Sequence, residues 1–200
     1  SAGVPRSTHE LSYSHSPTDW LNFTLHLELD GVLVDGWRAD HIGLETVVPL
    51  LRATESAGGL ALAWYTTLQA STDTLSTNSL VFGPIAKLST PGGRGWITIN
   101  PNLEDQFGRN AGPGLNLLYG WQARWKLNET WAIGVDGFGK IADLAHAPDA
   151  RDQDHRVGPA VYTELQITAD RKVTVDASLL VGLTEATPDL SLKFNVGAPF

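Results

Sequence analysis

The chain has 200 residues, with 22 acidic and 14 basic side chains and a net charge of -8 at pH 7. Because nucleic-acid binding depends on lysine and arginine contacting phosphates, this balance argues against a nucleic-acid partner. The absence of cysteine excludes disulfides and thiolate metal sites. No stretch approaches the roughly 20 consecutive apolar residues of a membrane-spanning helix, which argues against a helical membrane protein.

The length fits one domain over residues 1–200, with residues 1–6 as an N-terminal arm and 143–155 as the longest loop. Methionine is also absent, so residue 1 is not a translation start. We expect either a removed signal peptide or a fragment of a longer chain.

Alternation of apolar and polar residues is the main pattern along the chain. In residues 21–30, the polar side chains Asn22, Thr24, His26, Glu28 and Asp30 share one face of an expected strand. The same pattern is longer in residues 115–127. Such runs exceed the usual strand of about five or six residues and fit the 9 to 11 residues of a tilted membrane-spanning strand.

Weaker alternation fills most of the remaining chain and ends at an aromatic terminus. The run 190–200 places Leu192, Phe194 and Phe200 on one face and Lys193 and Asn195 on the other. In all, the sequence predicts eleven strands, at residues 7–15, 21–30, 37–50, 58–70, 79–89, 95–107, 115–127, 130–141, 156–168, 172–183 and 189–200.

Short turns and longer loops alternate between these segments, as they do in outer-membrane barrels. We therefore predict an all-β fold, an antiparallel up-and-down transmembrane β-barrel of 10 to 12 strands. Single-chain barrels of this class normally have an even strand number. Eleven visible strands then suggest a twelve-stranded complete form, whose first strand is absent from this chain or supplied by another segment.

The polar face of the strands predicts the lining of a barrel lumen. Acidic and basic side chains are nearly balanced on this face, and two roles stay open: a structural network of ion pairs, or a selective pore for small solutes. The expected lumen residues are His26, Glu28, Glu45, Glu104, Gln122, Arg124, Asp136, Lys140, Glu164, Asp176 and Lys193.

Aromatic residues at predicted strand boundaries are typical of the headgroup zone of a membrane, where amphipathic rings are favoured. The expected interface aromatics are Trp20, Trp37, Trp96, Trp131 and Phe200. The alternative is that these rings pack in a core.

Two features are candidates for chemical sites. His26 lies beside Glu28 on the polar face, where a carboxylate-oriented imidazole could activate a hydroxyl, but no serine is brought to it by the sequence. We expect a hydrogen-bonded lumen histidine and no catalytic residue. The loop 143–155 concentrates carboxylates and two histidines, and we expect a solvated loop, with divalent-cation binding as the alternative. No cofactor and no metal site are expected.

Short motifs of this chain resemble a functionally uncharacterised family of proteobacterial outer-membrane β-barrel proteins, grouped with outer-membrane transporters. The motifs are Ser16–Trp20, Gly83–Lys87 leading into Trp96–Asn100, Gly120–Arg124 before Gly134–Gly137, His155–Pro159 and Gly182–Asp189. The resemblance covers most of residues 9–200 and concerns fold far more than activity.

From the barrel prediction and this resemblance we expect a bacterial outer-membrane protein with a passive transport or structural envelope role. The expected partners are outer-membrane lipid and lipopolysaccharide, the barrel-assembly machinery through the C-terminal strand, and another protein chain. Two other functions stay open: a lipid-active or hydrolytic barrel enzyme, and a soluble lipocalin-like barrel that binds an apolar ligand.

Overall fold

The computed structural model describes residues 6–32, 36–53, 57–72, 77–168 and 171–198. They form one antiparallel sheet in which each strand pairs with the next along the chain. The strands are β1 (Arg6–Thr18), β2 (Leu21–Val32), β3 (Gly36–Leu51), β4 (Gly59–Ser71), β5 (Asn78–Ser89), β6 (Gly95–Phe107), β7 (Leu115–Lys126), β8 (Trp131–Ile141), β9 (Asp154–Thr168), β10 (Arg171–Gly182) and β11 (Leu190–Gly197). Short 3-10 turns occur at Pro91–Gly93, Leu144–His146 and Ala150–Asp152.

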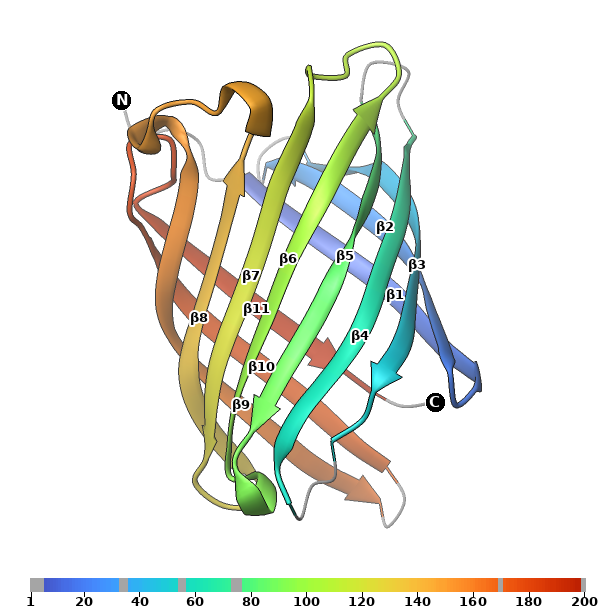
Figure 1. Cartoon of the computed structure of the whole chain (residues 1–200), viewed down its shortest axis with the longest axis vertical. Helices are drawn as coiled ribbons and strands as arrows, with labels where there is room; N and C mark the ends of the chain where they lie inside the picture. Colours follow the sequence, from blue (N-terminus) through green and yellow to red (C-terminus); the bar gives the residue numbers. More distant parts are fainter. Residues whose placement is uncertain (1–5, 33–35, 54–56, 73–76, 169–170, 199–200) are drawn as a thin grey trace.

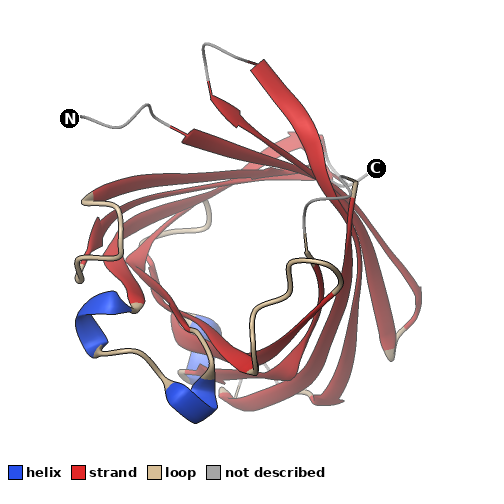
Figure 2. Cartoon of the chain, turned by 90° about the horizontal axis from the view of Figure 1, so that it is seen from above, coloured by secondary structure: helices blue, strands red, loops and turns tan. Residues whose placement is uncertain are grey.

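The eleven strands lie close to the eleven predicted segments, so the all-β, up-and-down antiparallel prediction is confirmed. The sheet curls around a central axis into an open, barrel-like form (Figure 1). Seen along that axis, the strands surround a central space (Figure 2). Within the described ranges, no helix has the length and apolar character needed to cross a membrane.

The connections divide the molecule into two ends. We call the end with residues 108–114, 142–153 and 183–189 the long-loop end, and the end with residues 19–20, 90–94 and 127–130 the short-turn end. The longest connection, 142–153, contains two of the 3-10 turns and covers most of the predicted loop 143–155. β11 ends at the short-turn end, which is opposite to the end where β1 begins (Figure 1).

β1 and β11 are the two edges of the sheet, and no ladder of hydrogen bonds joins them in the described part of the chain. Because ten successive pairings are all antiparallel, the first and last strands run in the same direction. Both edges lie on the same side of the curled sheet (Figures 1 and 2). We call the space between them the seam.

The two faces of the sheet differ in polarity, and the apolar face is the exposed one. Large outward side chains such as Leu44, Trp64 and Phe194 are exposed, whereas Asp136 and Glu104 on the inward face are buried. The buried apolar cluster is small, consisting of Ala132, Ala160 and Tyr162. This distribution is opposite to that of a globular β-sandwich, in which apolar side chains gather between two sheets.

Candidate functional site

The inward face is the candidate functional site, because it gathers the polar side chains of nearly all strands. The strand register places all eleven residues expected in the lumen on the face that carries Asp136. Gln122 lies opposite Thr98 and Asp136 in the neighbouring strands. The other ten fall into several groups of contacting side chains.

Asp136 of β8 is the centre of the first group and is only 1% exposed. Its Oδ2 accepts a hydrogen bond from Ser178 Oγ at 2.6 Å, and the Tyr162 hydroxyl donates to Oδ1. Lys193 Nζ lies 3.7 Å from Oδ2 and 4.4 Å from the centre of the Phe138 ring. Four neighbouring strands, β8 to β11, are therefore linked through one carboxylate, and this is the arrangement a buried charge requires.

Arg124 extends the first group towards the short-turn end. Its guanidinium lies 3.5 Å from the centre of the Tyr162 ring, and its Nη2 lies 3.5 Å from Asp176 Oδ2. The planar cation is thus stacked on an aromatic face while it pairs with a carboxylate, a combination that favours arginine over lysine. Tyr162 joins Arg124 to Asp136, so the two ion pairs form one network.

Glu104 of β6 is the centre of the second group. Lys140 Nζ lies 2.6 Å from Glu104 Oε2, and the Asn116 side-chain amide donates to the same oxygen at 2.8 Å. The Asn116 side-chain oxygen accepts from the Asp143 backbone N–H at 2.9 Å. This group therefore connects the lumen wall to the loop that follows β8.

The third group lies on β1 to β3 and pairs carboxylates with imidazoles. His26 Nδ1 lies 3.0 Å from Glu10 Oε1, and His26 Nε2 lies 3.2 Å from Glu45 Oε2. Glu28 lies close to Asp40 and His41. The remaining predicted residue, Glu164, pairs with Lys172 at 3.3 Å.

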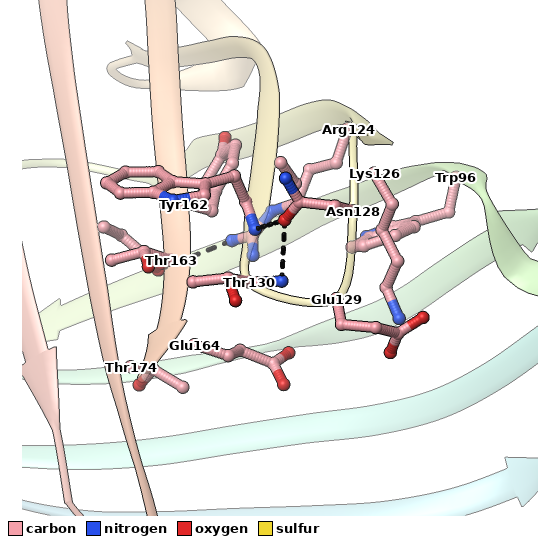
Figure 3. A pocket seen from close by; sticks show the side chains of 13 residues that line it. Trp96, Arg124, Lys126, Asn128, Glu129, Thr130, Tyr162, Thr163, Glu164 and Thr174 are labelled. Carbon is pink, nitrogen blue, oxygen red and sulfur yellow. Dashed lines mark hydrogen bonds and ion pairs between the residues drawn. The ribbon is translucent and has the colours of Figure 1, made fainter. Parts of the chain in front are cut away.

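A pocket of about 240 Å³ opens inside the short-turn end and is lined by strands β6 to β10 (Figure 3). Arg124, Lys126, Tyr162 and Glu164 line it, and the turn before β8 closes one side. In that turn, Asn128 Oδ1 accepts hydrogen bonds from the backbone N–H groups of Thr130 and Trp131 (Figure 3).

A second pocket of about 350 Å³ adjoins the first and shares Trp96, Lys126 and Glu164 with it. Lys87 Nζ lies 4.9 Å from the centre of the Trp96 ring, and Lys126 Nζ lies 5.9 Å from it. Two ammonium groups therefore lie near one indole. The acidic side chains Glu129, Glu164 and Asp176 balance the basic ones in the lining of the two pockets.

The predicted interface aromatics divide into two sets. Trp20, Trp37 and Trp131 are exposed near strand ends. Trp96 differs, because the register places it on the inward face opposite Arg124, where it lines both pockets. Trp96 lies at the start of β6, and a strand boundary does not fix the side to which a residue points. Phe200 lies outside the described residues.

Several site residues were not predicted from the sequence. Tyr162 and Ser178 share the alternation of Glu164 and Asp176, so extending the polar face along β9 and β10 could have found them. Asp40 and His41 are consecutive, and strict alternation places consecutive residues on opposite faces. No signal in the sequence pattern identified this pair.

Two further histidines contact oxygen atoms outside the inward face. His155 Nδ1 lies 2.6 Å from the Tyr119 hydroxyl on the outward face, and His146 Nδ1 lies 3.2 Å from Asp143 Oδ2 in the loop. The loop histidine is thus held by a single carboxylate at the start of a 3-10 turn.

Comparisons of this chain with protein families, with curated proteins and with solved structures found no match.

Proposed function

We propose that this protein is an integral β-barrel of a bacterial outer membrane, and that its lumen is a passive path for small hydrophilic solutes. The observation that carries the proposal is the inverted polarity of the sheet: large apolar side chains are exposed on the outside, and charged side chains line the inside. A bilayer is the solvent that makes this distribution favourable, because lipid covers the outside and water hydrates the lumen.

The outer face supports this proposal in a second way. A groove of about 840 Å³ runs over the outside of β5 to β9 and is lined almost wholly by apolar side chains, among them Leu88, Ile97, Trp125, Ile133 and Val161. A continuous apolar surface of this kind indicates a contact with lipid or protein. Acyl chains would fill the groove without requiring polar partners.

The passive path is supported by the way the charges pair. Lys140 with Glu104, Lys193 with Asp136 and Arg124 with Asp176 join strands two or three apart along the same wall. Several of these groups keep solvent contact, and the Lys140 side chain is 37% exposed. Pairing along the wall leaves hydrated charge facing the axis, which suits small polar solutes. The alternative role is purely structural, with a lumen that is closed to solutes.

The positions of the edge strand and of the outer wall also indicate partners. β11 ends at the short-turn end and exposes Leu192, Phe194 and Val196 on its outer side. This edge is suited to recognition by the barrel-assembly machinery, and the outer wall is suited to phospholipid and lipopolysaccharide. The short-turn end would then face the periplasm.

Single-channel recording tests the transport role. Purified protein is added to a planar bilayer, and we expect discrete conductance steps that change when Lys140 is replaced by glutamate. Lys140→Glu places two acidic side chains together in the lumen, so selectivity should shift towards cations. Arg151→Glu, in the exposed connection after β8, is the control and should conduct like the wild type. An absence of steps in correctly folded protein would remove the transport role and leave the structural one.

A soluble barrel that binds a small ligand in the lumen is the second candidate, because the two pockets at the short-turn end offer an enclosed aromatic and charged lining. Phase partition distinguishes the two candidates. A membrane barrel enters the detergent phase and migrates differently on gels before and after heating. A soluble barrel stays in the aqueous phase.

A further inference from the structure

Asp40 is the extra residue of a β-bulge between β2 and β3. Glu28 pairs with His41 and Leu29 pairs with Ala39, so no residue of β2 lies opposite Asp40, whose backbone oxygen accepts from the Thr72 N–H on the other side. A bulge of this kind re-aims side chains that would otherwise alternate. As a result, carboxylate oxygens of Glu28 and Asp40 and a ring nitrogen of His41 all lie within 4.8 Å of one another.

Both ring nitrogens of His41 lie next to oxygen atoms, and a neutral imidazole can donate a hydrogen bond to only one of them. His41 Nε2 lies 2.9 Å from the backbone oxygen of Thr77, and His41 Nδ1 lies 2.9 Å from Asp40 Oδ2. A backbone carbonyl can only accept, so Nε2 carries the hydrogen. In the neutral ring, Nδ1 is then an acceptor that faces a carboxylate oxygen, another acceptor. A proton or a metal ion between them satisfies both.

Three features favour a metal ion over a proton alone. Glu28 brings a second carboxylate to the same place, and it forms no ion pair with lysine or arginine in the described part of the chain. The bond from His41 Nε2 to the Thr77 carbonyl is the kind of outer contact that fixes the orientation of a ligating imidazole. Bonds of about 2.0–2.2 Å around one ion place its ligands up to about 4.4 Å apart, which small side-chain movements reach here.

The neighbouring histidine lacks this geometry. His26 has Glu10 at one ring nitrogen and Glu45 at the other, so its two carboxylates lie on different sides of the ring. One ion cannot be bound by the ring and by both of these carboxylates. His26 therefore serves as an internal comparison for His41, from the same wall of the lumen.

We propose that Glu28, Asp40 and His41 form a binding site for a first-row divalent transition-metal ion, represented by Zn²⁺, inside the lumen near the long-loop end. An imidazole with two carboxylates suits Zn²⁺ and its neighbours, whereas Ca²⁺ takes six to eight oxygen ligands. Water from the lumen would complete the coordination. The site goes beyond the proposed passive path. A metal ion bound near the long-loop end would be retained by the protein, whether or not other solutes cross the lumen.

Equilibrium dialysis of metal-free protein in detergent against Zn²⁺ tests the proposal. We expect one Zn²⁺ per chain, and a loss of affinity of about tenfold or more in His41→Gln and in Glu28→Gln. His26→Gln and His146→Gln are matched controls and should bind like the wild type. An equal excess of Ca²⁺ should leave Zn²⁺ bound.

Loading with Co²⁺ gives an independent readout, because its visible absorption reports coordination by the protein. The wild type should show a ligand-field band that His41→Gln lacks, and Glu28→Gln repeats the test if His41→Gln does not fold. The proposal is overturned if the wild type binds no Zn²⁺, if His41→Gln and Glu28→Gln bind it as tightly as the wild type, or if His26→Gln abolishes binding while His41→Gln does not.

Discussion

Ser178 donates a hydrogen bond of 2.6 Å to Asp136, two strands away across the inward face. Asp136 also accepts from the Tyr162 hydroxyl and faces Lys193, so one carboxylate connects four strands. Sequential hairpins hold each strand to the next, whereas inward contacts of this kind join strands that are not neighbours.

We therefore expect Asp136→Ala to lower the free energy of unfolding by about 2–3 kcal/mol, because it leaves the buried Ser178 and Tyr162 hydroxyls without their acceptor. Asp136→Asn keeps an acceptor oxygen and should cost less. Asp152→Asn, in the exposed loop, is the control and should change little. Denaturant titration of the protein in lipid vesicles measures all three. Equal stability of Asp136→Ala and the wild type would show that the network carries little of the stability.

Phe194 and Asn195 are adjacent on β11 and face opposite sides of the sheet. Phe194 is 62% exposed, so in water Phe194→Arg should be nearly neutral. In a bilayer, an arginine on the lipid face near the midplane costs about 2–4 kcal/mol. We expect that loss for Phe194→Arg and little change for Asn195→Arg, which lies opposite Asp176 on the hydrated side. Folding yield into vesicles at increasing urea compares the two variants. Equal behaviour of both would argue against a lipid-facing outer wall.

Gly158 is a close contact between β9 and β10. A Cβ atom at this position would lie 1.8 Å from the Leu179 backbone oxygen, so the strands must separate to accept any side chain. We expect Gly158→Ala to destabilise the barrel by about 1–3 kcal/mol. Gly120→Ala is the matched control, because its Cβ would meet the Phe138 ring at an ordinary 3.5 Å. Heat-modifiable migration on gels reports the folded fraction of each. Equal melting temperatures of the two variants would contradict this expectation.

The parallel directions of β1 and β11 predict how the seam closes. One strand placed between them can be antiparallel to both, which gives the even strand number usual for outer-membrane barrels. Such a strand holds the two edges about 10 Å apart, twice the spacing of neighbouring strands. Two copies in the same membrane orientation cannot supply this arrangement by edge pairing, because their edges would also run parallel.

Because the chain lacks cysteine, paired substitutions test the seam cleanly. We expect that Ser12→Cys combined with Ser191→Cys or Asn195→Cys forms no disulfide but reacts with a cross-linker that spans about 10 Å. Leu180→Cys with Ser191→Cys, which are opposite in paired strands, is the positive control. Rapid direct disulfides between β1 and β11 would show that the two edges pair with each other, and no strand then lies between them.

The alternation in the sequence predicted most of this fold. Runs such as 21–30 and 115–127 have one polar and one apolar face, and antiparallel pairing of neighbours through short turns then fixes both register and topology. That is why the lumen residues from Glu104 to Lys193 fall on one face. The partners of these residues were harder to predict from the sequence. The tilt and curvature of the sheet determine whether Asp136 contacts Lys193 or a basic residue closer to it along the chain.

Two features of the site were not predicted from the sequence: the bulge at Asp40 and the inward direction of Trp96. The bulge at Asp40 places two consecutive residues at one site, and no rule of period two anticipates it. Trp96 is of a residue type favoured at membrane interfaces, yet the register places its side chain on the inward face, beside Lys87 and Lys126. Trp96 keeps the alternation of Glu104, so the local pattern places it inward and only its residue type indicated the interface.

The central claim is that the outer face meets lipid and the inner face meets water, and the accessibility of spin labels along β10 tests it most directly. Single cysteines at Val173, Thr174, Val175, Asp176, Ala177 and Ser178 sample both faces of one strand, in protein reconstituted into vesicles. We expect that oxygen reaches the labels at Val173, Val175 and Ala177, and that a water-soluble nickel complex reaches those at Thr174, Asp176 and Ser178, in alternation. High accessibility of the outward labels to the nickel complex, with no lipid-facing alternation, would contradict it.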